Sequence, residues 1–368
     1  MPRAQLPAAN LVFLVDVSGS MQSPDKLELL KSALRLLVRE LEADDRVSLV
    51  VYAGASGVVL EPTPGDQSAT IGAALDGLTA GGSTNGGAGI RLAYALAQQA
   101  FIKDGINRVI LATDGDFNVG TVDFEMLKQL VEERRDYGIG LTTLGFGSGN
   151  YNDHLMEQLA DAGNGNYAYI DTLSEARKAL VDEMSSTLLT IAKDVKIQVE
   201  FNPATVAEYR LIGYENRALA REDFSNDKVD AGEIGAGHSV TAIYEIALVG
   251  GAGQRLETGR YQQELRSTAN TRELALVRLR YKKPGGDTST LIEQPVRKDE
   301  IIEDLGQTTD SYRFAAAVAG LGQILRGGKY TGEFGYPEVL TLARGARGED
   351  PFGYRGEFLQ LANLASSL

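Results

Sequence analysis

Residues 11–21 read LVFLVDVSGSM, and this stretch decides the fold class of the chain. Its first five residues are all apolar, which is typical of a short strand buried on both faces of a parallel sheet. The leucines of residues 26–41 recur on one stripe and predict a helix directly afterwards. In open α/β sheets, ligands bind at the carboxyl edge, where a strand hands over to a helix. At this turn the chain carries three oxygen side chains, on Asp16, Ser18 and Ser20.

The spacing of these three residues indicates a metal site. Side chains at positions i, i+2 and i+4 of a near-extended backbone point to the same side. One carboxylate and two hydroxyls suit a hard divalent cation, which prefers oxygen ligands and keeps several waters. We therefore expect Mg²⁺ here, with Mn²⁺ or Ca²⁺ as substitutes.

Two further loops are predicted to reach the same edge of the sheet. Residues 81–87, GGSTNGG, precede a helical stretch and contain Thr84. Residues 108–112, RVILA, form another buried strand, which is followed by Thr113 and Asp114. Because crossovers between parallel strands are nearly always right-handed, both loops should emerge beside Asp16.

Together these residues resemble the metal-ion-dependent adhesion site of von Willebrand factor A domains. The matching motifs are DxSxS at residues 16–20, Thr84 within GGSTN and Asp114 within TDG. A serine here could simply cap the next helix, and Asp16 could hold loop amides, but five oxygen groups on three loops favour a site. The resemblance implies that Ser18, Ser20 and Thr84 bind the cation directly. It implies that Asp16 and Asp114 act directly or through water.

The resemblance extends over nearly the whole chain to the bacterial YfbK-like proteins, which carry a C-terminal domain of unknown function. It rests on ATDGDFNVG, GNGNYAYIDTLSEA, AKDVKIQVEFNP and GEDPFGYRGEF, at residues 112–120, 163–176, 192–203 and 348–358. It implies a location in the cell envelope, periplasmic or surface-anchored. Such proteins usually begin with an export signal and a further segment, whereas this sequence starts almost directly at its first strand. We therefore expect it to be a shortened form.

The composition limits the functions that the chain can have. Its 368 residues are enough for two domains with separate cores. A formal net charge of −14 argues against unspecific nucleic-acid binding. The absence of cysteine excludes disulfides, thiolate catalysis and Cys-based zinc sites, and it leaves the compartment open. No apolar run approaches the ~18 residues that predict a membrane span.

The hydrophobic periodicity predicts three regions. Residues 1–192 alternate strands and helices, which is typical of a doubly wound, Rossmann-like α/β domain with a mostly parallel sheet. In residues 193–298 the apolar residues alternate with period two, which predicts a β-rich, sandwich-like domain. Residues 299–368 are predicted to form helices that pack on the preceding domains.

The first region is predicted to contain strands at residues 11–16, 46–52, 58–60, 108–113, 140–146 and 166–170. Its predicted helices cover residues 26–41, 68–76, 86–100, 124–137, 153–162 and 174–191. The later regions are predicted to hold strands at 194–203, 240–248 and 274–281, and helices at 310–325, 337–346 and 354–364. Asp44 and Asp45 are predicted to form an exposed turn.

Two enzyme classes share parts of this pattern. Phosphatases of the haloacid-dehalogenase type use DxD at such a turn, but Ser18 stands where their general acid would be. A serine hydrolase needs a base for its nucleophile, and its serine stands in a G-x-S-x-G elbow, which VSGSM lacks. The two histidines, His154 and His238, are interpreted as structural or solvated residues. Asp116 and Asp153 are acids near the predicted site, each either part of it or a solvated loop charge.

The predicted function is therefore binding without catalysis. A cation held largely by neutral hydroxyls stays electrophilic and favours a carboxylate from a partner protein. The resemblance implies an adhesion or scaffold module whose partner presents Asp or Glu to the metal. Two alternatives stay open: a cytoplasmic assembly factor for a metal-chelatase or ATPase-type complex, and a metal-dependent phosphatase.

Overall fold

Ala9–Asp16 form β1, a strand buried along its whole length inside a six-stranded sheet of the computed structural model. The strand order is β3-β2-β1-β4-β5-β6. Strand β1 pairs in parallel with β2 (Arg46–Tyr52) and β4 (Ile106–Thr113), whereas β3 (Ser56–Pro64) runs antiparallel to β2. The carboxyl ends of β1, β2 and β4 therefore lie at one edge of the sheet.

The structure describes residues 6–83, 86–115, 124–147, 152–182, 189–213, 219–229, 231–256 and 272–368. They divide into two compact units: Met1–Lys193 with Ala231–His238, and Asp194–Asp230 with Ser239–Leu368. Residues 231–238 group with the first unit, although their place in the sequence is among the β-rich residues.

The first unit continues with β5 (Gly140–Phe146) and β6 (Tyr167–Ile170), both parallel to their neighbours. Its helices are α1 (Leu29–Val38), α2 (Ser68–Asp76), α3 (Gly86–Gln99), α4 (Phe124–Asp136), α5 (Asp153–Ala162) and α6 (Leu173–Arg177). Shorter helical turns are η2 (Gly19–Gln22), η3 (Pro24–Glu28) and η4 (Lys178–Asp182).

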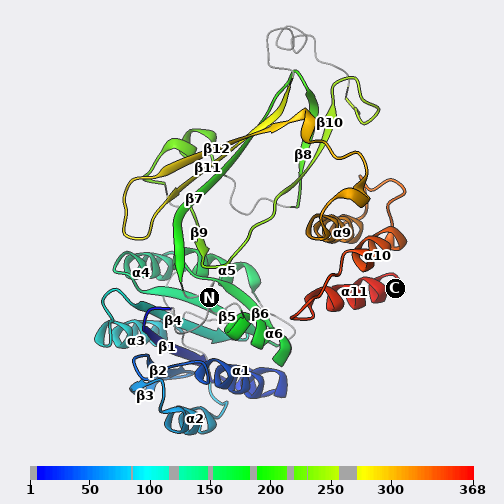
Figure 1. Cartoon of the computed structure of the whole chain (residues 1–368). Coiled ribbons are helices and arrows are strands. Elements are labelled where there is room, and N and C mark those ends of the chain that lie inside the picture. The colour runs from blue at the N-terminus through cyan, green and yellow to red at the C-terminus, as the bar shows by residue number, and fades with distance from the viewer. Residues whose placement is uncertain are drawn as a thin grey trace. The chain divides into compact units, whose positions relative to one another are not determined.

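Helices cover both faces of this sheet (Figure 1). Alternate side chains of β1 point into separate cores, as the pleat of a strand requires. Leu11 and Phe13 pack with residues of α1 and α2, whereas Val12 and Leu14 pack with residues of α3, α4 and α5. The doubly wound arrangement predicted from the alternating pattern is confirmed.

Three local predictions need correction. The helix predicted over residues 26–41 begins with η3, a turn of π-helix, and α1 ends at Val38. The helix predicted over residues 174–191 is wrong at its end, because Thr190 and Ile191 start β7 (Thr190–Phe201). Their β-branched side chains favour extended backbone. Residues 183–188 lie outside the described part of the chain.

The third correction concerns Asp45, which is fully buried rather than exposed in a turn. Its Oδ1 accepts a hydrogen bond from the main-chain nitrogen of Ala9 over 2.8 Å, and its Oδ2 accepts one from that of Glu42, also over 2.8 Å. The carboxylate thus joins the start of β1 to the turn before β2. Asp44 is exposed, as predicted.

Most of the remaining strands belong to the second unit, whereas β9 (Gly232–Gly235) is among the residues that group with the first unit. One sheet has the order β12-β11-β7-β9, and a second pairs β10 with β8. The strands beyond β7 are β8 (Val206–Ile212), β9 (Gly232–Gly235), β10 (Ile243–Leu248), β11 (Glu273–Lys282) and β12 (Thr290–Arg297); short helical turns are η5 (Arg221–Ser225), η6 (Lys298–Glu300) and η7 (Leu305–Gln307). The ring of Phe201 on β7 stacks on that of Tyr209 on β8, with centroids 4.2 Å apart. Aromatic packing therefore connects the two sheets.

Three helices end the chain: α9 (Asp310–Leu325), α10 (Tyr336–Gly345) and α11 (Tyr354–Ala365). They share a small core that includes Ala317, Val339 and Ala362. Asp350 accepts hydrogen bonds from the main-chain nitrogens of Arg355 and Gly356 over 3.0 and 2.8 Å, so it caps the start of α11.

The predicted fold class is confirmed: a mostly parallel sheet between helices, followed by antiparallel sheets and C-terminal helices.

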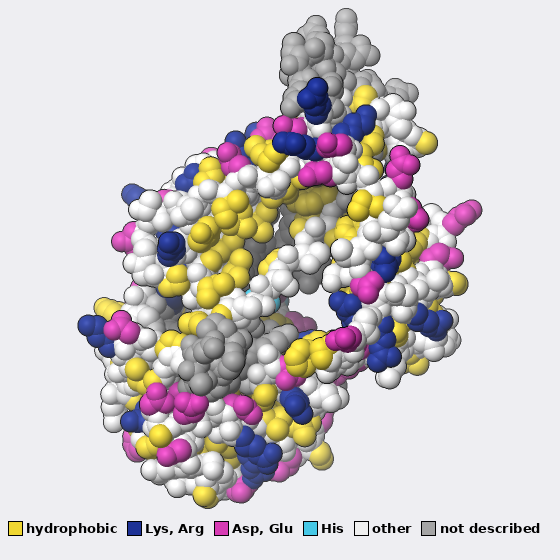
Figure 2. Space-filling view, in the orientation of Figure 1, with side chains coloured by type: hydrophobic (Ala, Val, Ile, Leu, Met, Phe, Trp, Pro, Cys, Tyr) yellow, Lys and Arg dark blue, Asp and Glu magenta, His cyan; other side chains and the backbone are white. Residues whose placement is uncertain are grey.

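Acidic and basic side chains are interspersed over the face in Figure 2. Within the residues that the structure describes, none of the helices has the length and apolar character needed to span a bilayer.

Candidate metal centre

The candidate site lies where β1, β2 and β4 end. Asp16, Tyr52 and Thr113 are the last residues of these strands, and all three are fully buried. The main-chain nitrogen of Val17 donates to the carbonyl of Tyr52 over 3.0 Å, which keeps the β1 loop against β2. The parallel pairing of the strands thus gathers polar groups at one edge of an apolar core.

The Asp16 carboxylate is fixed by two donors from different parts of the chain. Its Oδ1 accepts from the main-chain nitrogen of Ser18 over 2.8 Å, and its Oδ2 accepts from the hydroxyl of Thr113 over 3.1 Å. Burial raises the pKa of the Asp16 carboxyl, bonds from Ser18 and Thr113 oppose this rise, and the charge of Asp114 adds to it. Burial thus disfavours the charged form of Asp16, which a cation would compensate.

The two serines of the DxSxS motif lie next to each other. The hydroxyl oxygens of Ser18 and Ser20 are 3.0 Å apart, within hydrogen-bond distance. Ser18 is 2% exposed, whereas Ser20 is exposed. This pair of hydroxyls therefore runs from the buried carboxylate towards solvent, as a site open to a ligand requires.

Asp114 joins the site through a lysine. Nζ of Lys26 donates to Oδ2 of Asp114 over 2.9 Å and to the main-chain oxygen of Ser20 over 3.0 Å. The Asp114 side chain is 3% exposed. An ammonium group thus already bridges the β1 loop and the β4 loop at the candidate site.

The glycine-rich loop before α3 reaches the same edge. The main-chain nitrogen of Gly19 donates to the carbonyl of Gly82 over 3.0 Å, and that of Gly81 donates to the carbonyl of Val17 over 2.8 Å. Gly82 has φ of +85°, a conformation that suits glycine. Thr84 lies outside the described residues, so its role as a ligand stays a prediction.

The donors that the structure describes fit a hard divalent cation. The structure brings together the Asp16 carboxylate, the two serine hydroxyls and Asp114, all of them oxygen groups. Lys26 shows that a positive charge is accommodated between Ser20 and Asp114. In the described part of the chain, no group of three or more His, Cys, Asp or Glu residues could hold a metal. A cation would thus be held by a mixture of carboxylates and neutral hydroxyls.

Other residues singled out in the sequence lie elsewhere or outside the description. Asp153 accepts a hydrogen bond from the hydroxyl of Tyr167. His154 is exposed in the first turn of α5, 3.0 Å from the amide nitrogen of Gln158, and His238 is exposed after β9. Asp116 lies outside the described residues.

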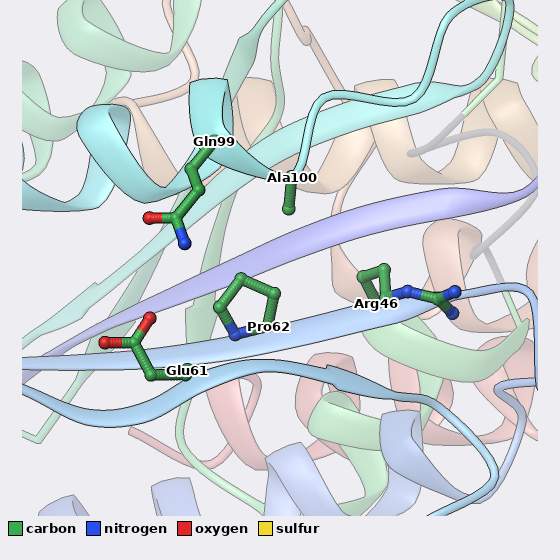
Figure 3. A pocket seen from close by; sticks show the side chains of 5 residues that line it. All are labelled: Arg46, Glu61, Pro62, Gln99 and Ala100. Carbon is green, nitrogen blue, oxygen red and sulfur yellow. The ribbon is translucent and has the colours of Figure 1, made fainter.

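A pocket of about 600 Å³ lies at the opposite edge of the sheet (Figure 3). It includes Arg46 at the start of β2 and Gln99 at the end of α3. The remaining lining residues are Glu61, Pro62 and Ala100. The pocket is therefore remote from Asp16, which ends its strand at the other edge.

Sequence reasoning missed three residues that surround Asp16 and Asp114. Thr113 was identified as a strand end but not as a donor, and Lys26 was identified as part of a helix. Tyr52 lies at the end of β2, and burial together with the Asp16 charge raises the pKa of its hydroxyl. The signal available for Thr113 and Tyr52 was their position at the ends of strands that flank β1.

Comparison with known families defines the class of protein. Residues 11–116 match the family described as von Willebrand factor type A domain. This match agrees with the six-stranded sheet and with the oxygen groups at its carboxyl edge. The chain is a von Willebrand factor type A domain protein.

Residues 186–368 match a second family, described as the C-terminal part of the uncharacterized protein YfbK. The chain therefore belongs to the YfbK-like family, in which the A domain is joined to this C-terminal region. Over 366 residues it is 49% identical to the "Uncharacterized protein YfbK" of Escherichia coli (strain K12), covering 99% of this chain and 63% of that protein.

Two further similarities are more remote. The chain is 33% identical over 186 residues to the "Uncharacterized protein sll0103" of Synechocystis sp., covering 50% of this chain and 43% of that protein. It is similar to the solved structure of a von Willebrand factor type A protein from Catenulispora acidiphila, with a TM-score of 0.49 and 19% identity, covering 95% and 82% of the two chains. The chain thus spans less than two thirds of the length of both curated relatives.

Proposed function

We propose that this chain is a non-enzymatic protein-binding module whose binding depends on a divalent cation, Mg²⁺ in the first place. Asp16, Ser18, Ser20, Thr84 and Asp114 hold the cation, and a partner protein supplies an Asp or Glu carboxylate to it. Von Willebrand factor A domains mediate protein binding and are usually not catalytic, which supports this assignment.

The observation that carries the proposal is the convergence of oxygen groups at one buried edge. Contacts of 2.8 to 3.1 Å connect these groups. The Asp16 carboxylate accepts from Ser18 and Thr113, and the Ser18 hydroxyl lies beside that of Ser20. Lys26 then joins Ser20 to Asp114. Ser20 is exposed at the rim, so a partner's side chain can approach from solvent.

The chemistry supports binding rather than turnover. A cation at this site would supply an electrophilic position for a carboxylate oxygen from outside. Two of the described donors, Ser18 and Ser20, are neutral hydroxyls, so they leave much of a cation's charge available to a partner. Hydrolysis would need a base, and the hydrogen bonds from Ser18 and Thr113 instead fix the buried Asp16 carboxylate in one orientation, as a cation ligand requires.

We further propose that the protein acts in the bacterial cell envelope, as an adhesion or scaffold component. This location rests on the resemblance to YfbK-like proteins. Fractionation of cells that express the full-length native gene tests it: recovery with membranes or periplasm supports it, and recovery in the cytosol alone contradicts it.

The binding function is tested by capture from a cell extract under three conditions: with Mg²⁺, with EDTA, and with EDTA followed by excess Mg²⁺. A specific partner should be captured in the first and third conditions and lost in the second. Ser18→Ala should abolish capture. Ser32→Ala is the matched control, because the Ser32 hydroxyl only donates to the carbonyl of Glu28 within the helical segment. Capture of every partner in EDTA would contradict the function.

A further inference from the structure

Lys26 occupies an unusual position for a lysine. Its ammonium group lies between Asp114 and the main-chain oxygen of Ser20, at 2.9 and 3.0 Å. Lys26 belongs to η3 and is separated from Asp114 by 88 positions in the sequence. The contact is therefore tertiary, and it places a fixed positive charge against two residues of the candidate metal centre.

The stem of Lys26 is confined as well as its charged end. The side chain is 17% exposed and crosses Gly147, which has φ of +80° directly after β5. A Cβ added to Gly147 would lie 2.7 Å from Cγ and 2.9 Å from Cδ of Lys26. The hydroxyl of Tyr169 donates to the carbonyl of Gly147 over 2.7 Å and holds the backbone that contacts the Lys26 side chain in place. The ammonium group is thus held at the site instead of moving freely in solvent.

An ammonium group and a divalent cation compete for the same oxygens. Both are attracted by the Asp114 carboxylate, and they repel each other at the short distance that a shared carboxylate imposes. Because the Asp114 side chain is 3% exposed, solvent screens this repulsion only weakly.

We propose that Lys26 is an internal competitor of the divalent cation. It neutralises Asp114 when no divalent cation is bound, and it leaves Asp114 when one binds. The inference rests on the proposed function, because it assigns a regulator to the same site. Lys26 thereby lowers the affinity for the cation and sets the concentration at which the site becomes competent to bind a partner.

A purely structural role for Lys26 makes the opposite prediction. If the ammonium group only held Asp114 in a ligating orientation, its removal would weaken cation binding. If it competes, removal strengthens binding. The sign of the change in Mg²⁺ affinity therefore separates the two roles.

The test is calorimetric titration of the whole chain with MgCl₂ at constant ionic strength. Lys26→Met keeps the stem and removes the charge, and it should bind Mg²⁺ at least about tenfold more tightly than the wild type. Lys26→Gln is a second neutral variant in case the first does not fold, and Lys26→Arg, which keeps the charge, should bind no more tightly than the wild type. Lys31→Met is the matched control, because Lys31 is also largely buried but pairs with Glu28.

Displacement is measured separately by acetylation of lysines, followed by peptide mass spectrometry. Mg²⁺ should speed the acetylation of Lys26 in the wild type, and Lys31 should not respond. A Ser18→Ala variant, which lacks one predicted ligand, should show no Mg²⁺-dependent change at Lys26.

The outcomes separate this inference from the proposed function. The competitor role is overturned if the neutral variants bind Mg²⁺ no more tightly than the wild type, or if Mg²⁺ does not speed the acetylation of Lys26. In either case the proposed function still stands, provided that the wild type binds Mg²⁺. If neither the wild type nor the neutral variants bind Mg²⁺, both proposals are overturned.

Discussion

The hydroxyl of Thr113 donates a hydrogen bond to Oδ2 of Asp16 over 3.1 Å, across 97 positions of the sequence. The same hydroxyl accepts a hydrogen bond from the main-chain nitrogen of Gly115 over 3.2 Å. One buried oxygen therefore orients the first predicted ligand and shapes the loop that carries Asp114. We conclude that Thr113 is a positioning residue of the candidate metal centre.

Replacement of Thr113 by valine should damage both stability and cation binding. The variant keeps the shape of the side chain but removes the hydrogen bond to Oδ2 of Asp16 and the acceptor of the Gly115 nitrogen, at a cost of about 1–3 kcal/mol. Thermal unfolding should shift down, and Mg²⁺ affinity by calorimetry should fall. Thr113→Ser keeps the hydroxyl and should restore most of the affinity. Wild-type Mg²⁺ affinity in Thr113→Val would show that the hydroxyl does not position Asp16.

Replacement of Asp16 by asparagine should separate binding from stability. The pKa of Asp16 is raised chiefly by burial, so the folded protein without a cation disfavours its charge. Asp16→Asn removes that charge and can still accept the bond from the Ser18 nitrogen. We expect loss of measurable Mg²⁺ binding, with a metal-free melting temperature equal to or above that of the wild type. Melting in EDTA and in Mg²⁺ gives both values. A lower melting temperature in EDTA would contradict the electrostatic argument.

Replacement of Gly147 by alanine offers an independent route to the Lys26 contact. The new methyl group would overlap the Lys26 stem, and the left-handed backbone at this position costs an alanine about 1 kcal/mol. We expect slightly lower stability and, because Lys26 is pushed from Asp114, tighter Mg²⁺ binding. Gly57→Ala is a suitable control, because a Cβ there meets no atom within 4 Å. The double variant Gly147→Ala/Lys26→Met should gain little over Lys26→Met alone; additive gains would mean that Gly147 acts on another group.

The strands of the first unit could be predicted because their sequence and their environment agree. Residues 46–52 (RVSLVVY) and 140–146 (GLTTLGF) are short stretches rich in Val, Leu, Thr and aromatic residues, and both form buried strands with the predicted bounds. The carboxyl edge followed from parallel pairing, so the place of Asp16 and Asp114 could be predicted as well. Local pattern decides such features, since a strand buried on both faces leaves few alternatives.

The remaining features depend on contacts that a local pattern does not contain. The sequence pattern predicts only that Lys26 belongs to a helix. Its contact with Asp114 requires the π-helical turn η3 and the glycine at position 147. The predicted helix over residues 174–191 failed at Thr190, where pairing within a sheet outweighs an apolar stripe. A strand of the second unit, β12, was missed because its side chains are mostly exposed and give little alternation.

Asp45 was predicted to be exposed but is fully buried, and it allows a stability test away from the candidate site. Its carboxylate accepts from the nitrogens of Ala9 and Glu42, each over 2.8 Å, at the edge of the sheet opposite Asp16. Asp45→Ala leaves these donors without their acceptor, at about 1–3 kcal/mol for the buried Ala9 nitrogen and less for that of Glu42, which is exposed. The urea midpoint should therefore fall clearly, and the Ala9 amide should lose protection from hydrogen exchange. Asp45→Asn keeps one acceptor oxygen, so its urea midpoint should lie between those of the wild type and Asp45→Ala. Because both predicted effects are confined to the amino edge of the sheet, Mg²⁺ affinity of the folded variant should equal that of the wild type; a parallel loss of affinity would show that the two edges of the sheet are coupled.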